Sequence, residues 1–288
     1  MDMNTNPSKM KSSLKHVVAV AKSMVKSASM PQVSAEKGSV VDLDTSFVAD
    51  IPLASVIEKN LQSFEVRDWR TYFSSKLSGR GLEIGPLHRP MVKHAGMQVE
   101  YIDRCTVAEL REHYPELNEL PLVEPDIIGD AENLAPIADQ SYDFLISAHV
   151  IEHMKNPLGS LEQWCRVVKP GGKIYLIVPD KRAIFDKHRV RTTLGHIILD
   201  YRRPSADRDF EHYLDYAIHV HDQRDSAALV EADRLVETDY SIHFHVFIPT
   251  DIINLLNWFS ENVRPLRILE GPCMTPGSDE FHFMLEVV

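Results

Sequence analysis

Two acidic residues, Glu83 and Asp103, lie 20 residues apart, each in or beside a short apolar run. Glu83 belongs to the sequence Gly-Leu-Glu-Ile-Gly at 81–85, which is typical of a buried strand that ends in a turn. Asp103 directly follows the strand-like residues 99–102. A strand–helix–strand unit brings a second carboxylate to the rim of a nucleoside pocket at roughly this spacing. The pair therefore predicts a site for an adenosine-containing cofactor.

Alternating strand-like and helix-like segments are expected to position these acids. Strands are expected at 81–84, 99–102, 126–129, 143–147, 173–178, 265–269 and 281–288, and helices at 107–114, 158–168 and 249–259. This alternation predicts a mostly parallel sheet with right-handed crossovers. The sequence Lys-Pro-Gly-Gly at 169–172 predicts a tight turn between a helix and the next strand. The last two strands lack a helix-sized connection, so an antiparallel pair is expected at the sheet edge.

A highly charged segment, residues 180–240, interrupts this alternation after the fifth strand. Its pattern predicts helices at 193–201, 205–220 and 226–236. Open α/β sheets bind ligands at the carboxyl ends of their strands, so the segment is expected to form a helical lid there. Charged residues at 180–191 are candidates for substrate selection, and a solvated surface is the alternative interpretation.

Four segments together resemble the class I S-adenosylmethionine-dependent methyltransferases, in particular those with a methyltransferase type 11 domain. They are residues 81–85, 101–103, 142–157 and 167–173, and the resemblance extends over about 65–288. It implies a doubly wound, Rossmann-like sheet of seven strands, mostly parallel with an antiparallel last strand. One departure is evident: Gly85 is followed by Pro86 and Leu87, where the family often has a second glycine.

The resemblance implies S-adenosylmethionine as the cofactor and assigns residues to its parts. Glu83 would bind the amino group, Gly85 would let the backbone approach, and Asp103 would accept both ribose hydroxyls. The residues expected at the adenine ring are Asp130 and Ala131, and those expected at the methionine end are Ser147 and His149. The alternative for the acids is that they are exposed residues at strand ends.

Methyl transfer is an in-line displacement, so the protein mainly aligns the reactants and excludes water. An oxygen or nitrogen acceptor also needs a base. The candidates are His149, Asp180 and His153, which follow the fourth and fifth predicted strands. His153 belongs to a Glu-His pair frequent in the family, where a structural role is the alternative.

His243 and His245 alternate along an extended segment and are therefore expected to face the same side. Two imidazoles on one strand could bind a metal. No third ligand is evident in the sequence, so packing or substrate contact is favoured and no metal site is predicted.

The first 40 residues differ from the rest, carrying six lysines against Asp2 and Glu36. We expect a basic tail or amphipathic helix at 1–40, and a methyltransferase domain with its lid at 41–288. Residues 8–28 could touch a membrane surface or a partner, and a loosely docked tail is the alternative. Three widely spaced cysteines predict a reducing, cytoplasmic setting.

The net charge of −11 argues against a nucleic-acid partner, because phosphate binding needs clustered lysine and arginine. The expected acceptor is a small molecule or glycan, methylated on oxygen or nitrogen. Two alternatives remain open. A nicotinamide-dependent oxidoreductase would need the Gly-x-Gly-x-x-Gly sequence that is absent here, and a non-catalytic methyltransferase-like module would bind a partner. The oligomeric state is left open.

Overall fold

The computed structural model describes residues 68–114 and 117–288. These residues fall within one compact unit, Arg67–Val288. The expected amphipathic helix at 8–28 and the predicted boundary at residue 40 lie outside the described residues. Along the described chain, no helix combines the length and the apolar character needed to cross a membrane.

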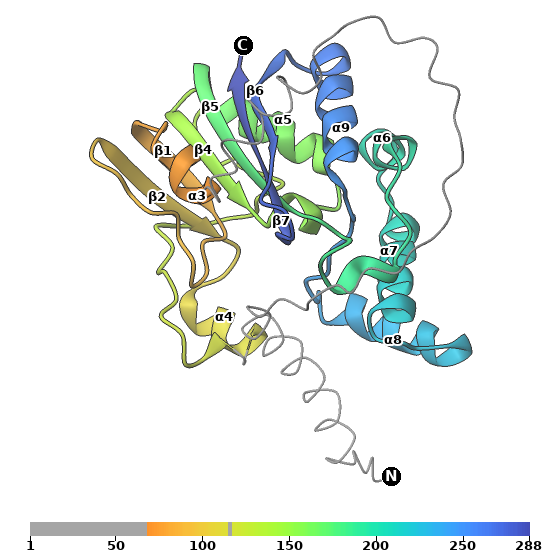
Figure 1. The fold of residues 1–288 in the computed structure, drawn as a ribbon. Helices are drawn as coiled ribbons and strands as arrows, with labels where there is room; N and C mark the ends of the chain where they lie inside the picture. Colours follow the sequence, from red (N-terminus) through yellow and green to blue (C-terminus); the bar gives the residue numbers. More distant parts are fainter. Residues whose placement is uncertain (1–67, 115–116) are drawn as a thin grey trace, which may run out of the picture. The chain divides into compact units, whose positions relative to one another are not determined.

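The unit is built on a seven-stranded sheet with the strand order β3-β2-β1-β4-β5-β7-β6 (Figure 1). The strands are β1 Gly79–Ile84, β2 Met97–Asp103, β3 Ile127–Ile128, β4 Tyr142–Ala148, β5 Val168–Pro179, β6 Leu266–Cys273 and β7 Glu280–Val287. β1 is parallel to both β2 and β4, whereas β7 is antiparallel to both β5 and β6. The predicted seven-stranded, mostly parallel sheet with an antiparallel last strand is confirmed.

Helices occupy the connections between these strands. They are α3 Trp69–Ser74, α4 Val107–His113, α5 Pro157–Val167, α6 Leu194–Arg202, α7 Ala206–His219, α8 Asp225–Glu237 and α9 Pro249–Asn262. Two short 3-10 turns, η2 Ile151–His153 and η3 Phe185–His188, follow β4 and β5. The start of α5 is fixed locally: the Asn156 side chain accepts the Gly159 N–H at 3.0 Å, and Pro157 occupies the first turn.

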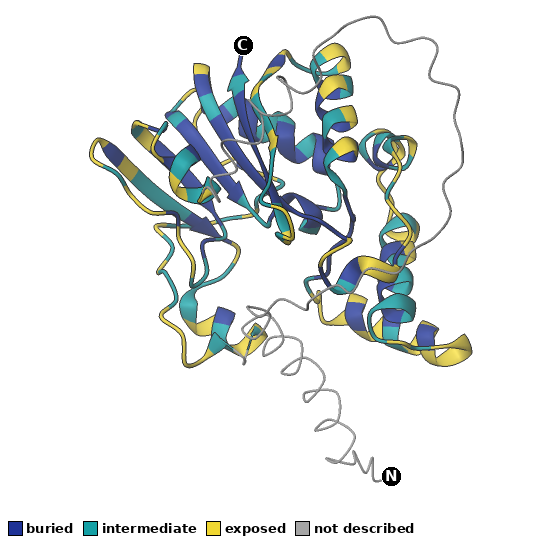
Figure 2. Ribbon diagram, viewed as in Figure 1, coloured by how far each residue is buried: buried dark blue, intermediate teal, exposed yellow. Residues whose placement is uncertain are grey.

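Both faces of the sheet are covered, as Figure 2 shows by the buried central strands. Successive residues of β4 point to opposite faces, since side chains alternate along a strand. Leu145 belongs to the larger core, shared with α5 and α9, whereas Phe144 and Ile146 join the smaller core beneath α3. This two-sided burial explains why β4 is apolar almost throughout.

The expected turn at 169–172 is wrong in one respect. β5 begins at Val168, directly after α5, and its pairing with β4 shifts register between Tyr142 and Phe144. The Lys-Pro-Gly-Gly sequence is therefore an irregularity inside the strand. Gly171 has a φ of +77°, and a Cβ on Gly172 would lie 2.7 Å from the Asp143 carbonyl oxygen. The glycine pair thus permits a bulge that a larger residue would block.

Residues 180–247 add three helices after β5, near the positions 193–201, 205–220 and 226–236 where helices were expected within 180–240. α6 packs against α5 and α9, so it is anchored to the helical layer of the sheet. α7 and α8 pack together around a separate small core that includes Tyr213, Leu235 and Phe244. The segment 242–247, expected to be extended, forms no strand and lies between α8 and α9.

Candidate active site

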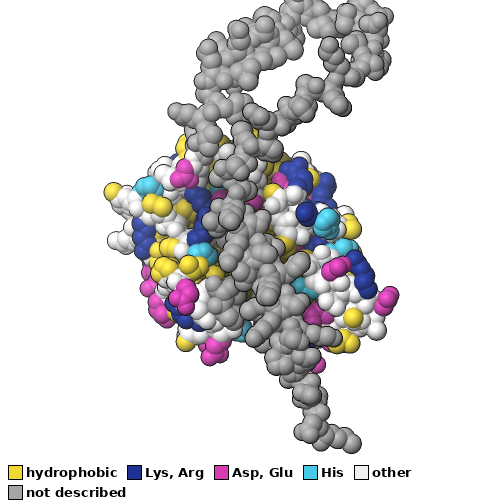
Figure 3. Space-filling view, turned by 60° about the horizontal axis from the view of Figure 1, so that its bottom comes forward, with side chains coloured by type: hydrophobic (Ala, Val, Ile, Leu, Met, Phe, Trp, Pro, Cys, Tyr) yellow, Lys and Arg dark blue, Asp and Glu magenta, His cyan; other side chains and the backbone are white. Residues whose placement is uncertain are grey.

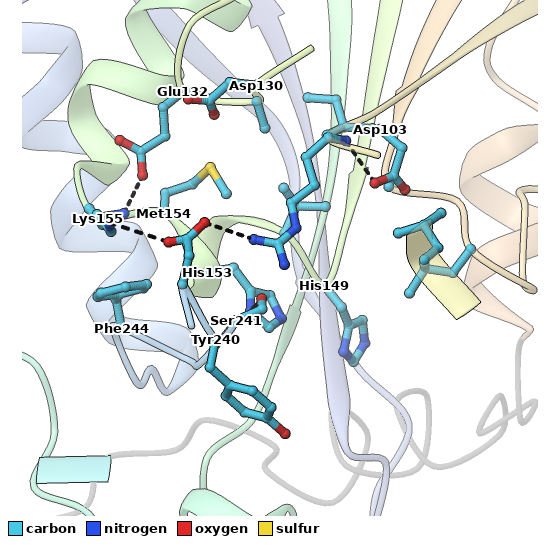
Figure 4. A pocket seen from close by; sticks show the side chains of 18 of the residues that line it. Asp103, Asp130, Glu132, His149, His153, Met154, Lys155, Tyr240, Ser241 and Phe244 are labelled. Atoms are coloured by element: carbon cyan, nitrogen blue, oxygen red, sulfur yellow. Dashed lines mark hydrogen bonds and ion pairs between the residues drawn. The ribbon is translucent and has the colours of Figure 1, made fainter. Parts of the chain in front are cut away.

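A cavity of about 400 Å³ lies at the carboxyl ends of β1, β2 and β4 (Figure 4). Its lining comes from two sources, the loops after these strands and the segment 180–247. The strand side contributes Gly85, Leu87, Asp103, Asp130, Ala131, Glu132, His149 and His153, and the other side contributes Tyr213, Asp239, Tyr240, Ser241 and Phe244. Five of the seven predicted cofactor residues line this cavity, as does His153.

Asp103 ends β2 at the cavity wall. One carboxylate oxygen accepts the Arg104 N–H at 2.7 Å, which fixes the side chain against the following turn. Burial raises the pKa of Asp103, and the neighbouring backbone N–H groups and Arg104 oppose this shift. The Asp103 carboxylate still has lone pairs that are not used by the backbone, so it can accept hydrogen bonds from two adjacent hydroxyl groups.

The loop after β1 explains the departure from a glycine-rich sequence. Gly85 has a φ of +60° and Leu87 a φ of +45°, so both occupy the left-handed region. A Cβ on Gly85 would meet only Val150, at 3.6 Å, which is ordinary contact. Glycine is therefore favoured at 85 for its backbone conformation, and Leu87 adopts the same left-handed region despite its side chain. The Leu87 carbonyl accepts the Val123 N–H at 2.8 Å, which anchors this turn.

The turn at 130–132 is held on two sides. The Asp130 carboxylate accepts the Glu132 N–H at 2.8 Å, and the Ala131 carbonyl accepts the Trp164 indole N–H at 2.9 Å. Glu132, which was not predicted, accepts the Lys155 N–H, and burial raises the pKa of its carboxyl. Glu132 could have been found from the sequence, because it lies two residues after Asp130, which was a predicted site residue.

Three predicted site residues are not brought to the cavity: Glu83, Ser147 and Asp180. Glu83 points to the α3 side of β1, accepts the Met91 N–H at 2.8 Å, and is buried so deeply that its pKa rises to about 7. The Ser147 hydroxyl is buried without a hydrogen-bond partner among the described residues. Asp180 is bound by the Arg182 guanidinium, with Nε 2.8 Å from Oδ1.

His149 is held in an ion-pair network at the cavity edge. Its Nε2 lies 2.8 Å from the Glu280 carboxylate, which also binds Arg70 at 2.6 Å. Burial lowers the pKa of His149, but the hydrogen bond to Glu280 and the charge of Glu152 outweigh it, so the net pKa is raised. A raised pKa favours the protonated ring, which can donate a hydrogen bond but cannot remove a proton.

His153 has the opposite character. Its Nδ1 lies 2.9 Å from the Ile242 carbonyl oxygen, so the proton of a neutral ring resides on that nitrogen. Burial, followed by the charge of His243, holds the pKa of His153 well below its ordinary value. The neutral ring leaves Nε2 as an acceptor, the state that a general base requires.

The wall facing the strands was not foreseen from the sequence. Tyr240 and Phe244, which are labelled in Figure 4, supply aromatic surface together with Tyr213. Asp239 lies between two cations. Its carboxylate is 3.5 Å from Arg104 and 4.0 Å from the Lys155 ammonium. On the face in Figure 3, basic, acidic and histidine side chains of the described residues are interspersed.

The charged residues at 180–191 divide between interior and surface. Asp180, Lys181, Asp186 and Arg189 are buried, whereas Arg182, Lys187 and Arg191 are exposed, so a solvated surface describes only part of this stretch. Asp186 and Arg189 are buried and paired at 2.9 Å, and Arg189 also binds Asp215 at 2.6 Å. None of the three lines the cavity.

His243 and His245 do not form one ligand pair. The Nδ1 of His243 lies 2.6 Å from Asp186, whereas His245 is buried beside Asp200, with Nε2 3.9 Å from that carboxylate. The expectation that they act on one side of a strand is wrong because this segment forms no strand.

Comparison with known proteins bears on the class of this chain. Residues 80–176, from β1 into β5, match the model of the methyltransferase domain family. The ubiquinone/menaquinone biosynthesis C-methyltransferase UbiE of Laribacter hongkongensis (strain HLHK9) is 27% identical over 112 residues, which is 36% of this chain and 43% of the relative. The match thus spans less than half of that relative's length.

Solved structures resemble the fold distantly. The plantazolicin methyltransferase BamL is 12% identical, with 82% of this chain and 91% of that chain covered and a TM-score of 0.42. A methyltransferase from Methanosarcina mazei is 18% identical, with 76% of this chain and 96% of that chain covered and a TM-score of 0.37. A protein described as a putative zinc-dependent alcohol dehydrogenase from Rhodobacter sphaeroides is 13% identical, with 77% of this chain and 90% of that chain covered and a TM-score of 0.47.

The family match is therefore confined to residues 80–176, about a third of the chain, which carry a methyltransferase domain by this comparison. The order of the sheet and the acids that line the cavity at its strand ends agree with the resemblance to the class I methyltransferases noted in the sequence.

Proposed function

We propose that this protein transfers a methyl group from S-adenosylmethionine to a small acceptor, a small molecule or a glycan, held between the strand ends and the lid. The observation that carries this proposal is that five of the seven predicted cofactor residues share one cavity with an aromatic wall from segment 180–247. The cavity volume of about 400 Å³ falls in the range of small-molecule sites, about 300–1,000 Å³.

Each strand-end residue has a proposed part in cofactor binding. Asp103 accepts the ribose hydroxyls, Asp130 meets the adenine amino group and Ala131 offers its N–H to the ring. The left-handed turn at Gly85 keeps the backbone close to the ligand. Glu83 acts from behind by fixing the Met91 N–H and hence the loop after β1.

The cofactor supplies a methyl carbon already activated by a sulfonium. As the acceptor atom bonds to this carbon, the carbon–sulfur bond breaks and its electron pair stays on sulfur, leaving S-adenosylhomocysteine. The protein therefore aligns the acceptor and excludes water. For a hydroxyl or amine acceptor, we assign proton removal to the neutral His153, while the protonated His149 orients a polar group as a donor.

Calorimetric titration with S-adenosylmethionine tests the cofactor assignment. Asp103→Ala removes the acceptor of two hydroxyl hydrogen bonds, so we expect affinity to fall on the order of 100-fold. Glu100→Ala is the matched control on the same strand, because its carboxylate pairs with Arg80 and does not line the cavity. Equal affinity of wild type and Asp103→Ala would sink the assignment.

The acceptor is tested by detecting S-adenosylhomocysteine across a panel of phenols, amines and hydroxylated sugars. The name of the Laribacter relative specifies C-methylation, so the panel includes quinol rings with an open carbon position, and the product is mapped by mass spectrometry. A product methylated on oxygen or nitrogen supports the proposal. A product methylated on carbon contradicts O- or N-methylation and assigns the protein to C-methylation instead. Cofactor binding with no turnover throughout the panel favours the non-catalytic module.

A further inference from the structure

Four side chains outside the cavity converge on one point in the lid: His196, Asp200, His212 and His245. His196 and Asp200 lie one turn apart on α6, His212 comes from α7, and His245 comes from the segment before α9. Figure 1 shows α6 and α7 beside each other. No sequence motif joins these residues, because packing of three separate elements brings them together.

The distances within this cluster are short and similar. The Nε2 atoms of His196, His212 and His245 lie 3.2, 3.7 and 3.9 Å from Asp200 Oδ2. The Nε2 atoms of His196 and His212 are 3.2 Å apart. The imidazole planes of neighbouring rings cross at 74–83°, so the rings meet through their edges and are not stacked.

Asp200 is the member that needs a partner. It is 4% exposed, and its Oδ1 is bound by the Arg208 Nε at 2.6 Å. Its Oδ2 is buried, makes no hydrogen bond within the described part of the chain, and faces the three ring nitrogens. A buried carboxylate oxygen without a donor is costly, and a cation between these four atoms would remove that cost.

We propose that these four side chains bind a zinc ion. Zinc is held tetrahedrally by imidazole nitrogen and carboxylate oxygen at about 2.0–2.2 Å, which sets adjacent ligand atoms about 3.3 Å apart. Four of the six separations between ligand atoms are 3.2–3.9 Å, and all six lie within 4.8 Å, so the cluster reaches this geometry by contracting around the ion. His245 Nε2, which lies 3.4 Å from the Lys155 carbonyl oxygen, would give up that contact to bind the ion. Three imidazoles and one carboxylate also favour zinc over magnesium or calcium, which prefer oxygen.

The proposed ion has a structural task. Four protein ligands close the coordination shell, as in structural zinc sites, and none of them lines the cavity. The ion would tie α6, which packs on α5 and α9, to α7 and to the segment that carries Phe244 into the cavity wall. It would thereby fix the acceptor side of the site relative to the sheet.

Another group among the described residues, Glu152, His153 and His243, could also hold a metal. It offers three ligands, and His153 belongs to the cavity. A variant of this second group therefore serves as the control that shows which of the two groups binds zinc.

The test measures zinc bound to the full chain after chelator treatment and reloading with zinc chloride. Wild type is expected to hold a single zinc per chain by elemental analysis and to unfold at a higher temperature when loaded. His212→Ala and the milder His196→Gln, at the partly exposed position, are expected to lose the ion and the thermal gain. Cobalt(II) should give the intense visible bands of four-coordinate cobalt in wild type and not in His212→Ala or His196→Gln.

Two controls make the outcome decisive. His219→Ala changes a histidine on the same helix that pairs with Asp215, and zinc binding should be unchanged. His243→Ala perturbs the second group and should also leave zinc in place. Absence of zinc and cobalt uptake in wild type, or loss of zinc in His243→Ala with retention in His212→Ala, overturns the proposal.

Discussion

The strand-end side of the cavity and the lid carry similar polar residues but use them differently. On the strand side, Asp103 and Asp130 face the cavity and are held by backbone N–H groups of the residues that follow them. In segment 180–247, Asp186 is buried and paired with Arg189, and the buried Asp200 binds Arg208 through Oδ1. Polar groups near the sheet are therefore available to a ligand, whereas those in the lid bind its own helices together.

This contrast teaches that charge density does not distinguish a binding surface from an internal network. The segment after β5 has the charged composition of a solvated surface, yet Arg189 and His245 are almost inaccessible to solvent. Buried charges persist only when paired and hydrogen-bonded. The lid thus depends on specific electrostatic partners to a degree that the apolar sheet core does not.

The largest expected effect tests this internal network directly. Arg189→Ala removes the guanidinium that pairs with both Asp186 and Asp215 and leaves the buried Asp186 with His243 as its remaining partner. Loss of one partner of a buried pair costs about 3–5 kcal/mol. Urea unfolding measures the change. Arg224→Ala is the matched control in the same segment, since its side chain is 65% exposed, and it should stay within about 0.5 kcal/mol. If both variants lose equally little unfolding free energy, the buried ion pairs do not stabilise this segment more than exposed ones do.

A smaller, pH-dependent effect is expected at Glu83 on the strand side. Burial raises its pKa from 4.5 to about 7, so the folded state favours the neutral carboxyl. That contribution to stability is complete below pH 4.5 and is lost as the pH rises towards 7. Because one pKa unit corresponds to about 1.4 kcal/mol, the free energy of unfolding should differ by about 3 kcal/mol between pH values below 4.5 and above 7.

Glu83→Gln keeps a neutral side chain at every pH and isolates this effect. The free energy of unfolding of the variant, relative to wild type, should increase between pH 4.5 and 7 in denaturant titrations. Glu100→Gln serves as the comparison, because the Tyr142 hydroxyl, together with Arg80, lowers the pKa of Glu100. A flat difference for Glu83→Gln across this range would contradict the burial argument.

The smallest expected effect concerns the boundary between the two regions. Glu280→Gln removes the charge that holds His149 protonated, so the His149 ring should titrate at lower pH than in wild type. Proton NMR of the ring measures this shift. Glu286→Gln, on the same strand but paired with Arg267, should leave the His149 titration unchanged. An unaltered titration in Glu280→Gln would show that Glu280 does not control this ring.

The sheet and the strand-end acids were predictable because local signals agree with the global fold. Apolar runs ending in Asp103 and in the residues before Asp130 mark strands, and their acids reach one cavity because parallel strands end at one edge. Side-chain direction was harder to predict. Glu83 lies on a correctly predicted strand, yet its carboxylate binds the Met91 N–H and does not reach the cavity at the strand ends.

The lid contacts were not predictable because they depend on how helices dock. The helices themselves were expected, but nothing local specifies that Tyr213 and Phe244 share a wall with Asp103. His196 and Asp200 at i and i+4 offered one signal that could have been used. Their partners, His212 and His245, come from elements whose relative positions follow only from tertiary packing.

The anchoring of α6 has a consequence for engineering acceptor specificity. Because α6 packs on α5 and α9 while carrying His196 and Asp200, the lid is not an independent module. Transplanting residues 180–247 into another methyltransferase would separate α6 from the two helices that support it. Exchange of acceptor preference between relatives should therefore succeed when α5 and α9 are transferred together with the lid, and fail when the lid is transferred alone.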